Sequence, residues 1–159
     1  MKVSLLCVGA AKGALRPAIA EYENRIGRYW RFQVSEVDGG VGKGRKVDEE
    51  QVRAAEEDRL LARLPEGRRA LIALTRDGET WGSRELAQFM EEQAVRSVPE
   101  VTFVIGGAFG LGKAILESSS LKLSLSAMTL PHEIARLLLA EQLYRAGTIL
   151  RNEPYHKGP

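Results

Sequence analysis

Residues 101–112 read Val-Thr-Phe-Val-Ile-Gly-Gly-Ala-Phe-Gly-Leu-Gly, and this stretch decides the fold. Residues 101–105 are β-branched or aromatic and uncharged, which is typical of a strand buried on both faces. The four glycines within 106–112 indicate a turn in which the backbone closely approaches a ligand or another strand. A plain strand-to-helix turn would show the same glycines. Their order, G-G-x-x-G-x-G, differs from the dinucleotide-binding pattern G-x-G-x-x-G.

The two segments that follow extend this pattern toward the C-terminus. Residues 121–132, Leu-Lys-Leu-Ser-Leu-Ser-Ala-Met-Thr-Leu-Pro-His, predict a strand and then a tight loop. Residues 133–147 predict a helix that is apolar on nearly all sides, and such a helix is buried. Because a short chain has little interior, we expect a second copy of the chain to cover it. The helix also carries Arg136, Glu141 and Arg145, and charges at buried positions are usually paired or functional.

Strands and helices alternate in the rest of the chain. The predicted strands are 3–8, 32–37 and 70–75, and the predicted helices are 14–30, 48–64 and 83–96, with turns at 65–67 and 76–78. This order predicts one α/β domain over residues 1–159, with a mainly parallel sheet and helices on both faces. Such sheets bind ligands beyond the carboxyl ends of their strands. The loops after Leu74, after Ile105 and over 125–130 therefore predict a pocket.

A basic, glycine-rich segment at 38–47 is the main local signal for nucleic acid. Its sequence, Asp-Gly-Gly-Val-Gly-Lys-Gly-Arg-Lys-Val, places Lys43, Arg45 and Lys46 among four glycines. A flexible and positively charged chain can follow a phosphate backbone and become ordered when it binds. A solvated loop without a partner would have the same composition, so both interpretations stay open.

Composition and missing motifs exclude several classes of protein. The net charge of the 159 residues is only +2, so any nucleic-acid binding must rest on local patches. Cys7 is the one cysteine, and its apolar neighbours favour a buried, unreactive thiol. No apolar run is long enough to span a membrane, and we expect a cytoplasmic protein. The two histidines lack metal ligands at standard spacing, and no P-loop or G-x-S-x-G motif occurs, so we expect no metal.

Four motifs, taken in order, connect the chain to a known family. They are I-G-G-x-x-G-L from Ile105, L-S-x-M-T-x-P-H from Leu125, A-E-Q-L-Y-R-A from Ala140, and P-Y-H near the C-terminus. Together they resemble the small SPOUT-class methyltransferases. The closest resemblance is to the RlmH (YbeA) family, which methylates N3 of a pseudouridine in the large-subunit ribosomal RNA of bacteria. The likeness covers essentially the whole chain.

The resemblance implies a SPOUT α/β-knot, whose C-terminal trefoil knot binds S-adenosylmethionine. Physics alone would not predict the knot, because threaded chains are rare. The resemblance also implies a homodimer that acts on ribosomal RNA or the ribosome, and it strengthens the RNA-binding interpretation of the basic segment. The cofactor is expected to touch the three strand-end loops through Leu74, Gly106, Gly107, Leu125, Ser126, Ala127, Met128, Thr129 and Leu130.

The implied reaction suggests roles for residues near the C-terminus. The imide nitrogen must lose its proton, and the enzyme can help by positioning and by stabilising the developing anion. We assign Arg145 to anion stabilisation or phosphate anchoring, and Glu141, one helical turn away, to orienting it. Tyr155 and His156 are expected to enter the site of the partner subunit, with His156 as a candidate base. His132 is expected to begin a helix and to hydrogen-bond the backbone.

Other functions fit parts of the sequence. An RNA-binding module with this fold but no cofactor would be recognised by its failure to bind adenosylmethionine. A methyltransferase that acts on a different RNA would share the same motifs. An unrelated nucleotide-binding oxidoreductase would need a dinucleotide fingerprint, which the glycine pattern does not supply.

Overall fold

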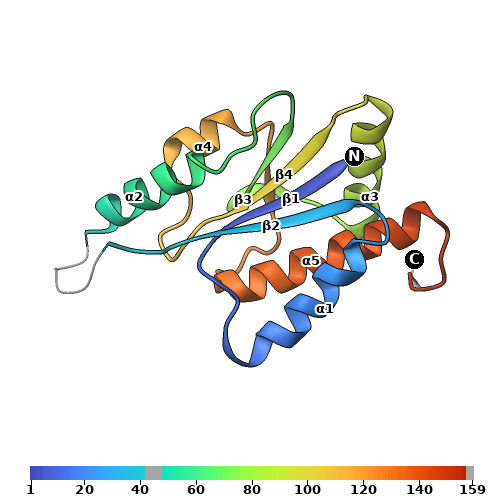
Figure 1. Ribbon diagram of the computed structural model, residues 1–159, viewed down its shortest axis with the longest axis horizontal. Coiled ribbons are helices and arrows are strands. Elements are labelled where there is room, and N and C mark those ends of the chain that lie inside the picture. Colours follow the sequence, from blue (N-terminus) through green and yellow to red (C-terminus); the bar gives the residue numbers. More distant parts are fainter. Residues whose placement is uncertain (42–47, 157–159) are drawn as a thin grey trace.

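The computed structural model describes residues 1–41 and 48–156, and these form a parallel sheet with flanking helices (Figure 1). The strands are β1 (Lys2–Val8), β2 (Arg31–Val37), β3 (Ala70–Thr80), β4 (Glu100–Ile105) and β5 (Leu121–Ser124). The helices are α1 (Arg16–Ile26, after a 3-10 turn at Gly13–Leu15), α2 (Glu49–Leu61), α3 (Ser83–Val95), α4 (Lys113–Ser118) and α5 (His132–Leu150). The predicted α/β fold is confirmed.

The sheet has the strand order β2-β1-β4-β3-β5, and every neighbouring pair is parallel. Strands β1 and β4 are buried almost throughout because their apolar residues are covered from both faces. All carboxyl ends therefore meet at one edge of the sheet, as the pocket prediction requires.

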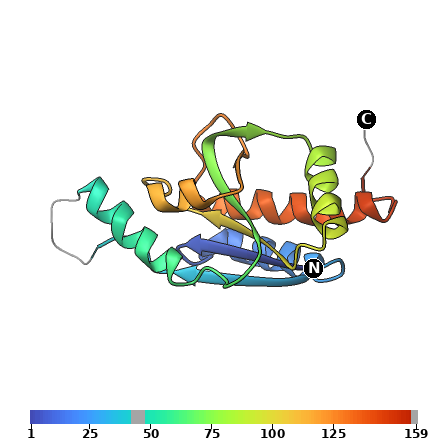
Figure 2. The ribbon, with the colours of Figure 1, turned by 90° about the horizontal axis from the view of Figure 1, so that it is seen from above.

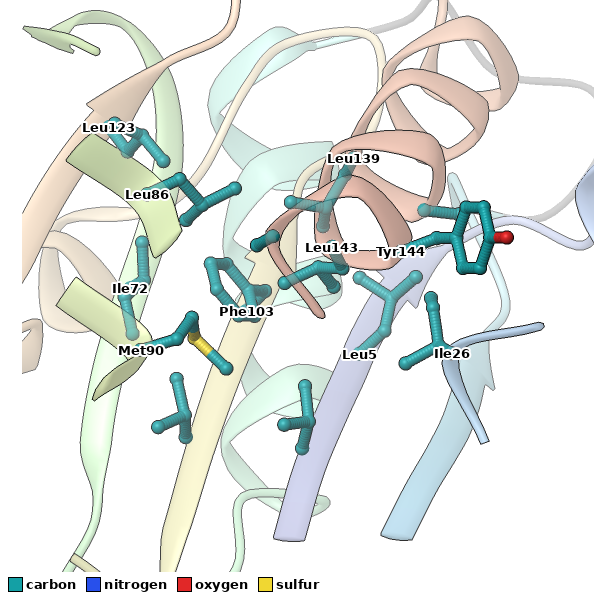
Figure 3. Close-up of a cluster of buried hydrophobic side chains, with 14 of the residues drawn as sticks. Leu5, Ile26, Ile72, Leu86, Met90, Phe103, Leu123, Leu139, Leu143 and Tyr144 are labelled. Carbon is teal, nitrogen blue, oxygen red and sulfur yellow. The ribbon is translucent and has the colours of Figure 1, made fainter. Parts of the chain in front are cut away.

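Helices cover both faces of the sheet, which confirms that part of the prediction. Helices α1, α3 and α5 pack on one face around a large core that includes Met90, Phe103 and Leu139 (Figure 3). Helices α2 and α4 cover the other face, where Leu60 and Ile115 pack against strand residues. Figure 1 shows α2 and α4 on one side of the sheet and α1 and α5 on the other.

Three predicted boundaries differ from the structure. Helix α1 ends at Ile26, and α5 continues to Leu150. The turn predicted at 76–78 is instead an irregular part of β3, because Leu74 and Glu79 both pair with Leu123 and the residues between them bulge. The sequence signal was the glycine at 78. Its backbone lies so close to residues 122–123 that a side chain would collide with them.

Helix α5 is largely covered by its own chain. Leu139, Leu143 and Ala146 are completely buried beneath α1, α3 and the sheet. The expectation that a single chain lacks the interior to cover this helix is wrong for this face. The face left partly uncovered is near the start of the helix, where Ile134 is exposed and Leu137 and Leu138 are half-buried.

Candidate active site

The three segments predicted to form a pocket are brought together by strand register. Leu74 on β3 pairs with Ile105 on β4 and with Leu123 on β5. The Gly106–Gly107 turn and the 125–130 loop begin directly beyond these partners, so they flank Leu74 at the carboxyl edge of the sheet. The predicted convergence is confirmed for the three strand ends.

The glycine turn is compact because it folds onto itself. The amide N–H of Gly110 donates to the carbonyl oxygen of Gly107 over 3.1 Å, and Gly110 has φ +78°. A Cβ atom on Gly106 would lie 2.7 Å from the carbonyl carbon of Gly110. The turn's own backbone therefore accounts for Gly106 and Gly110, since no larger residue fits the first and few adopt the conformation of the second.

The 125–130 loop keeps its shape through its own polar groups. The Ser126 hydroxyl accepts from the Met128 amide over 3.0 Å, and the Ser124 hydroxyl donates to the Ser126 carbonyl over 3.0 Å. Arg76, from the bulge of β3, donates to the Thr129 hydroxyl over 3.3 Å. Ala127 and Thr129 are exposed, and Met128 keeps 77% of its surface in solvent. The loop thus offers accessible backbone beside apolar side chains.

A second cluster lies near the end of α5 and joins three of the predicted catalytic residues. The Arg145 guanidinium donates two hydrogen bonds to one carboxylate oxygen of Glu141, over 2.5 and 3.0 Å. The Tyr155 hydroxyl donates to the same oxygen over 3.1 Å, and the guanidinium lies 5.0 Å from the Tyr155 ring centroid. Glu141 thus orients Arg145, as the sequence predicts.

Two pKa values in this cluster shift for identifiable reasons. The hydrogen bonds to Glu141 raise the pKa of Arg145, so the cation is secured. Burial raises the pKa of Tyr155 well above its usual range, and hydrogen bonds to Tyr22 and Glu141 add to this effect. At neutral pH Tyr155 is therefore a hydrogen-bond donor and not a phenolate.

His156 stands apart from this cluster. Within the described residues, its two ring nitrogens are buried and have no hydrogen-bond partner. His132 begins α5, and its ring lies against Gly9. Lys43, Arg45 and Lys46 lie outside the described residues.

Sequence reasoning missed the aromatic residues that hold the tail. Tyr155 packs edge-on against Tyr144 with ring centroids 4.7 Å apart, and its hydroxyl lies 3.4 Å from that of Tyr22 on α1. The Tyr29 hydroxyl donates to Glu153 over 2.5 Å. Tyr22 and Tyr29 are more than 120 residues away from their partners in the sequence, so no local pattern could have identified these contacts.

The strand-end segments and the α5 cluster lie far apart within one chain. The 125–130 loop precedes α5 and the tail follows it, so the two lie at opposite ends of the helix (Figure 2). From His132 to Arg145 the helix rises about 20 Å. The sequence analysis treated Arg145 as part of the cofactor pocket, to be met by a partner's tail. Within one chain, Arg145 instead belongs with its own tail residue, Tyr155.

Metal and membrane roles were searched for directly. Across residues 1–41 and 48–156, no group of His, Cys, Asp and Glu is arranged to hold a metal ion. No helix in this part of the chain is long and apolar enough to cross a bilayer.

Comparison with known proteins identifies the family. The family model described as "Predicted SPOUT methyltransferase" matches residues 1–156. The chain belongs to this SPOUT family. A relative named "Ribosomal RNA large subunit methyltransferase H" from Gemmatimonas aurantiaca is 47% identical, with 99% of this chain and 100% of the relative covered. One of the same name from Syntrophotalea carbinolica is 43% identical, with 98% and 99% covered.

Solved structures agree with the SPOUT assignment at the level of fold. The structure named "Probable Methyltransferase from Bordetella pertussis Tohama I" has a TM-score of 0.56 at 17% identity, and the match covers 91% of this chain and 95% of that one. The chain order supplies the elements of the expected knot, since β5 returns to pair with β3 after β4 and α4. The threading of a SPOUT trefoil knot stays a prediction.

Proposed function

We propose that this chain is an S-adenosylmethionine-dependent methyltransferase that acts on N3 of a pseudouridine in bacterial 23S ribosomal RNA, with the assembled ribosome as substrate. The observation that carries the proposal is 47% and 43% identity, over nearly the whole chain, to relatives named ribosomal RNA large subunit methyltransferase H. Work on ribosomes would place the protein in the cytoplasm.

The strand-end segments fit an adenosyl ligand. Adenine and ribose need backbone donors and acceptors beside apolar walls. The 125–130 loop has small, exposed residues between the half-buried Leu125 and Leu130, and Leu74 and the glycine turn border it. When bound, S-adenosylmethionine supplies a methyl group on a positively charged sulfonium. These segments would hold it and position that group for in-line transfer.

The α5 cluster fits the other half of the reaction. Arg145 would stabilise the negative charge that develops on the imide, and Glu141 fixes the guanidinium through its two hydrogen bonds. Tyr155, kept protonated by its raised pKa, would donate to the base and not remove a proton. His156 has ring nitrogens with no partner among the described residues, so it is the candidate base.

A complete site then requires two copies of the chain. The methyl-donor segments and the α5 cluster are separated by about 20 Å along α5, which is too far for one chain to join them at one nucleotide. A homodimer in which α5 contributes to the interface would place the cluster of one copy beside the strand-end loops of the other. The apolar start of α5, left partly uncovered, supports such an interface.

The proposal is tested by methyl transfer from labelled S-adenosylmethionine to ribosomes, separated subunits and free ribosomal RNA, followed by mapping of the modified nucleotide. We expect label on one pseudouridine of the large-subunit RNA, with the assembled ribosome as the best substrate. Cofactor binding without transfer to any of these would favour a different RNA. The absence of cofactor binding in calorimetry would favour an RNA-binding module.

A further inference from the structure

Helix α2 connects the glycine turn to the first residues of the basic segment. On one side, the Arg53 guanidinium donates to the Phe109 carbonyl over 3.1 Å. On the other side, the Arg59 guanidinium donates to the carbonyls of Asp38 and Gly40 over 2.8 and 2.9 Å. One rigid helix therefore contacts both the proposed cofactor turn and the chain that leads into the proposed RNA-binding segment.

Glu56 lies between these two contacts and touches both partners. Its side chain is 4% exposed, and one carboxylate oxygen accepts the Gly40 amide over 2.8 Å. The other oxygen, Oε2, faces Gly107 so closely that a Cβ atom there would lie 2.5 Å from it. The carboxylate thus fills the space that makes glycine necessary at position 107.

The oxygen that faces Gly107 lacks a hydrogen-bond partner. Among the described residues it is one of few buried side-chain atoms in this condition. A buried acceptor without a donor destabilises the fold, and an apolar residue of similar size would avoid the cost. The cost is offset if a donor arrives when the protein binds its ligands. The donors nearest in the chain are the backbone N–H groups of the glycine turn.

We infer that Glu56 is a positioning residue whose open oxygen accepts a backbone N–H of the glycine turn when cofactor occupies the neighbouring pocket, so that cofactor binding is linked to RNA binding. The link is mechanical. A shift of Gly107 moves the carboxylate, which holds Gly40, and Arg59 holds the same residue from the next turn of α2. This inference rests on the proposed function.

The test separates the open oxygen from the rest of the side chain. Glu56→Gln keeps the size of the side chain and one oxygen for the Gly40 amide, but it replaces the open acceptor with an NH₂ group. Glu57→Gln is the matched control, because Glu57 is the next residue of α2 and its carboxylate only accepts the Ile115 amide of α4, over 3.0 Å. Gly107→Ala is a second variant, since the added methyl would push the carboxylate away from the turn.

Two affinities are measured for each protein, with unfolding temperature as the check on folding. The first is calorimetric binding of S-adenosylhomocysteine alone. The second is ribosome binding at fixed salt, with and without S-adenosylhomocysteine. We expect the wild type and Glu57→Gln to bind ribosomes at least about fivefold more tightly when the cofactor product is present. In Glu56→Gln and Gly107→Ala that ratio should fall to near one, and S-adenosylhomocysteine should bind several-fold more weakly.

The outcomes distinguish this inference from the proposed function. A merely structural Glu56 would lower the unfolding temperature and leave the ratio and the cofactor affinity unchanged, which overturns the inference. A wild-type ratio of one also overturns it, even if methyl transfer is intact. If the wild type neither binds ribosomes nor transfers methyl groups, the proposed function itself fails, and the linkage fails with it.

Discussion

At the residue scale, Arg136 shows how a charge can be buried inside an apolar helix. Its side chain is 5% exposed, and its guanidinium donates to Glu23 over 2.7 Å and to Glu36 over 2.5 Å. It also lies 3.6 Å from the Cys7 sulfur. The sequence predicted that such a charge would be paired or functional. The partners could not be predicted, because they lie 113 and 100 residues away in the chain.

Removal of this cation should destabilise the protein strongly. Arg136→Met leaves two carboxylates without a partner, and the free energy of unfolding should fall by about 3–5 kcal/mol. Urea unfolding at pH 7 measures the change. Lys113→Met is the matched control, because it breaks only the exposed 3.5 Å pair with Glu117 and should cost less than about 0.5 kcal/mol. A loss for Arg136→Met no larger than that of the control would contradict this account.

The same network should make stability depend on pH. Burial alone would raise the pKa of Glu36, but hydrogen bonds from Arg136 and from the Ala11 amide outweigh it and lower the pKa. A folded pKa below the unfolded value gives stability that is present above the unfolded pKa, which is about 4.3 for glutamate. That stability is lost as pH falls through the folded value. The difference in unfolding free energy between wild type and Arg136→Met should therefore shrink below about pH 4.

Cys7 confirms a simpler expectation at this scale. The sequence predicted a buried thiol from its apolar neighbours, and the side chain is 2% exposed. Burial raises its pKa to about 11, with Arg136 acting in the opposite direction. Such a thiol is protonated and unreactive at neutral pH.

At the element scale, the strands were predictable because uncharged β-branched runs have few alternatives. Val3 to Val8 and Val101 to Ile105 are buried strands for that reason. Their order in the sheet was not predictable, since it depends on contacts between residues far apart in the chain. The bulge of β3 was also missed. The Asp77-Gly78 pair normally signals a turn, and only the close approach of β5 shows why glycine is needed there.

The candidate site was predictable in one half and not in the other. The strand-end loops follow from the rule that parallel strands present their carboxyl ends at one edge. The placement of Arg145 with its own tail could not be derived, because it depends on Tyr22 and Tyr144 packing against Tyr155. Aromatic spacing on α1 and α5 carries no signal for that contact.

The basic segment is the element whose role is most directly measurable. Replacement of Lys43, Arg45 and Lys46 by alanine should weaken RNA binding because phosphate contacts are lost. The slope of log affinity against log salt should flatten by about 0.7–0.9 for each contact. Cofactor affinity, measured by calorimetry, should be unchanged.

A matched triple variant controls for total charge. Arg63, Arg84 and Lys113 are exposed cations on α3, α4 and the turn after α2, and their replacement by alanine removes the same charge elsewhere. RNA affinity and the salt slope should then stay near the wild-type values. An unchanged slope in the basic-segment variant would identify its cations as solvated bystanders.

At the scale of the whole molecule, the partly uncovered start of α5 predicts a homodimer. Stable dimers of this kind usually bury more than about 2,000 Å² in total. Sedimentation should show a dimer at micromolar concentration. Ile134→Glu places a charge on the 36% exposed apolar side chain of α5 and should give a monomer. Val95→Glu changes a more exposed apolar residue on α3, at 79%, and should leave the dimer intact. A wild-type monomer would rule out the shared site.

The final prediction is that the tail completes the site of the partner. Deletion of residues 154–159 should abolish methyl transfer while cofactor binding and the dimer are preserved, because the pocket segments are untouched. A tail that only frays in solvent would leave activity intact. A pocket variant supplies the complementary defect. Gly106→Ala would collide with the backbone of Gly110, and Ala127→Arg, on the exposed loop, serves if that protein folds poorly.

Mixing the two inactive proteins decides between the arrangements. In a heterodimer, the tail-deleted chain has an intact pocket and the pocket variant has an intact tail. If each site joins the pocket of one chain to the α5 cluster and tail of the other, one site per heterodimer is complete, and equal mixing should restore about a quarter of wild-type activity. Arg145→Ala would not serve as the pocket variant, because Arg145 lies with Tyr155 of its own chain and would not complement a missing tail. No recovery, with subunit exchange verified by mass spectrometry, would mean that each tail serves the pocket of its own chain.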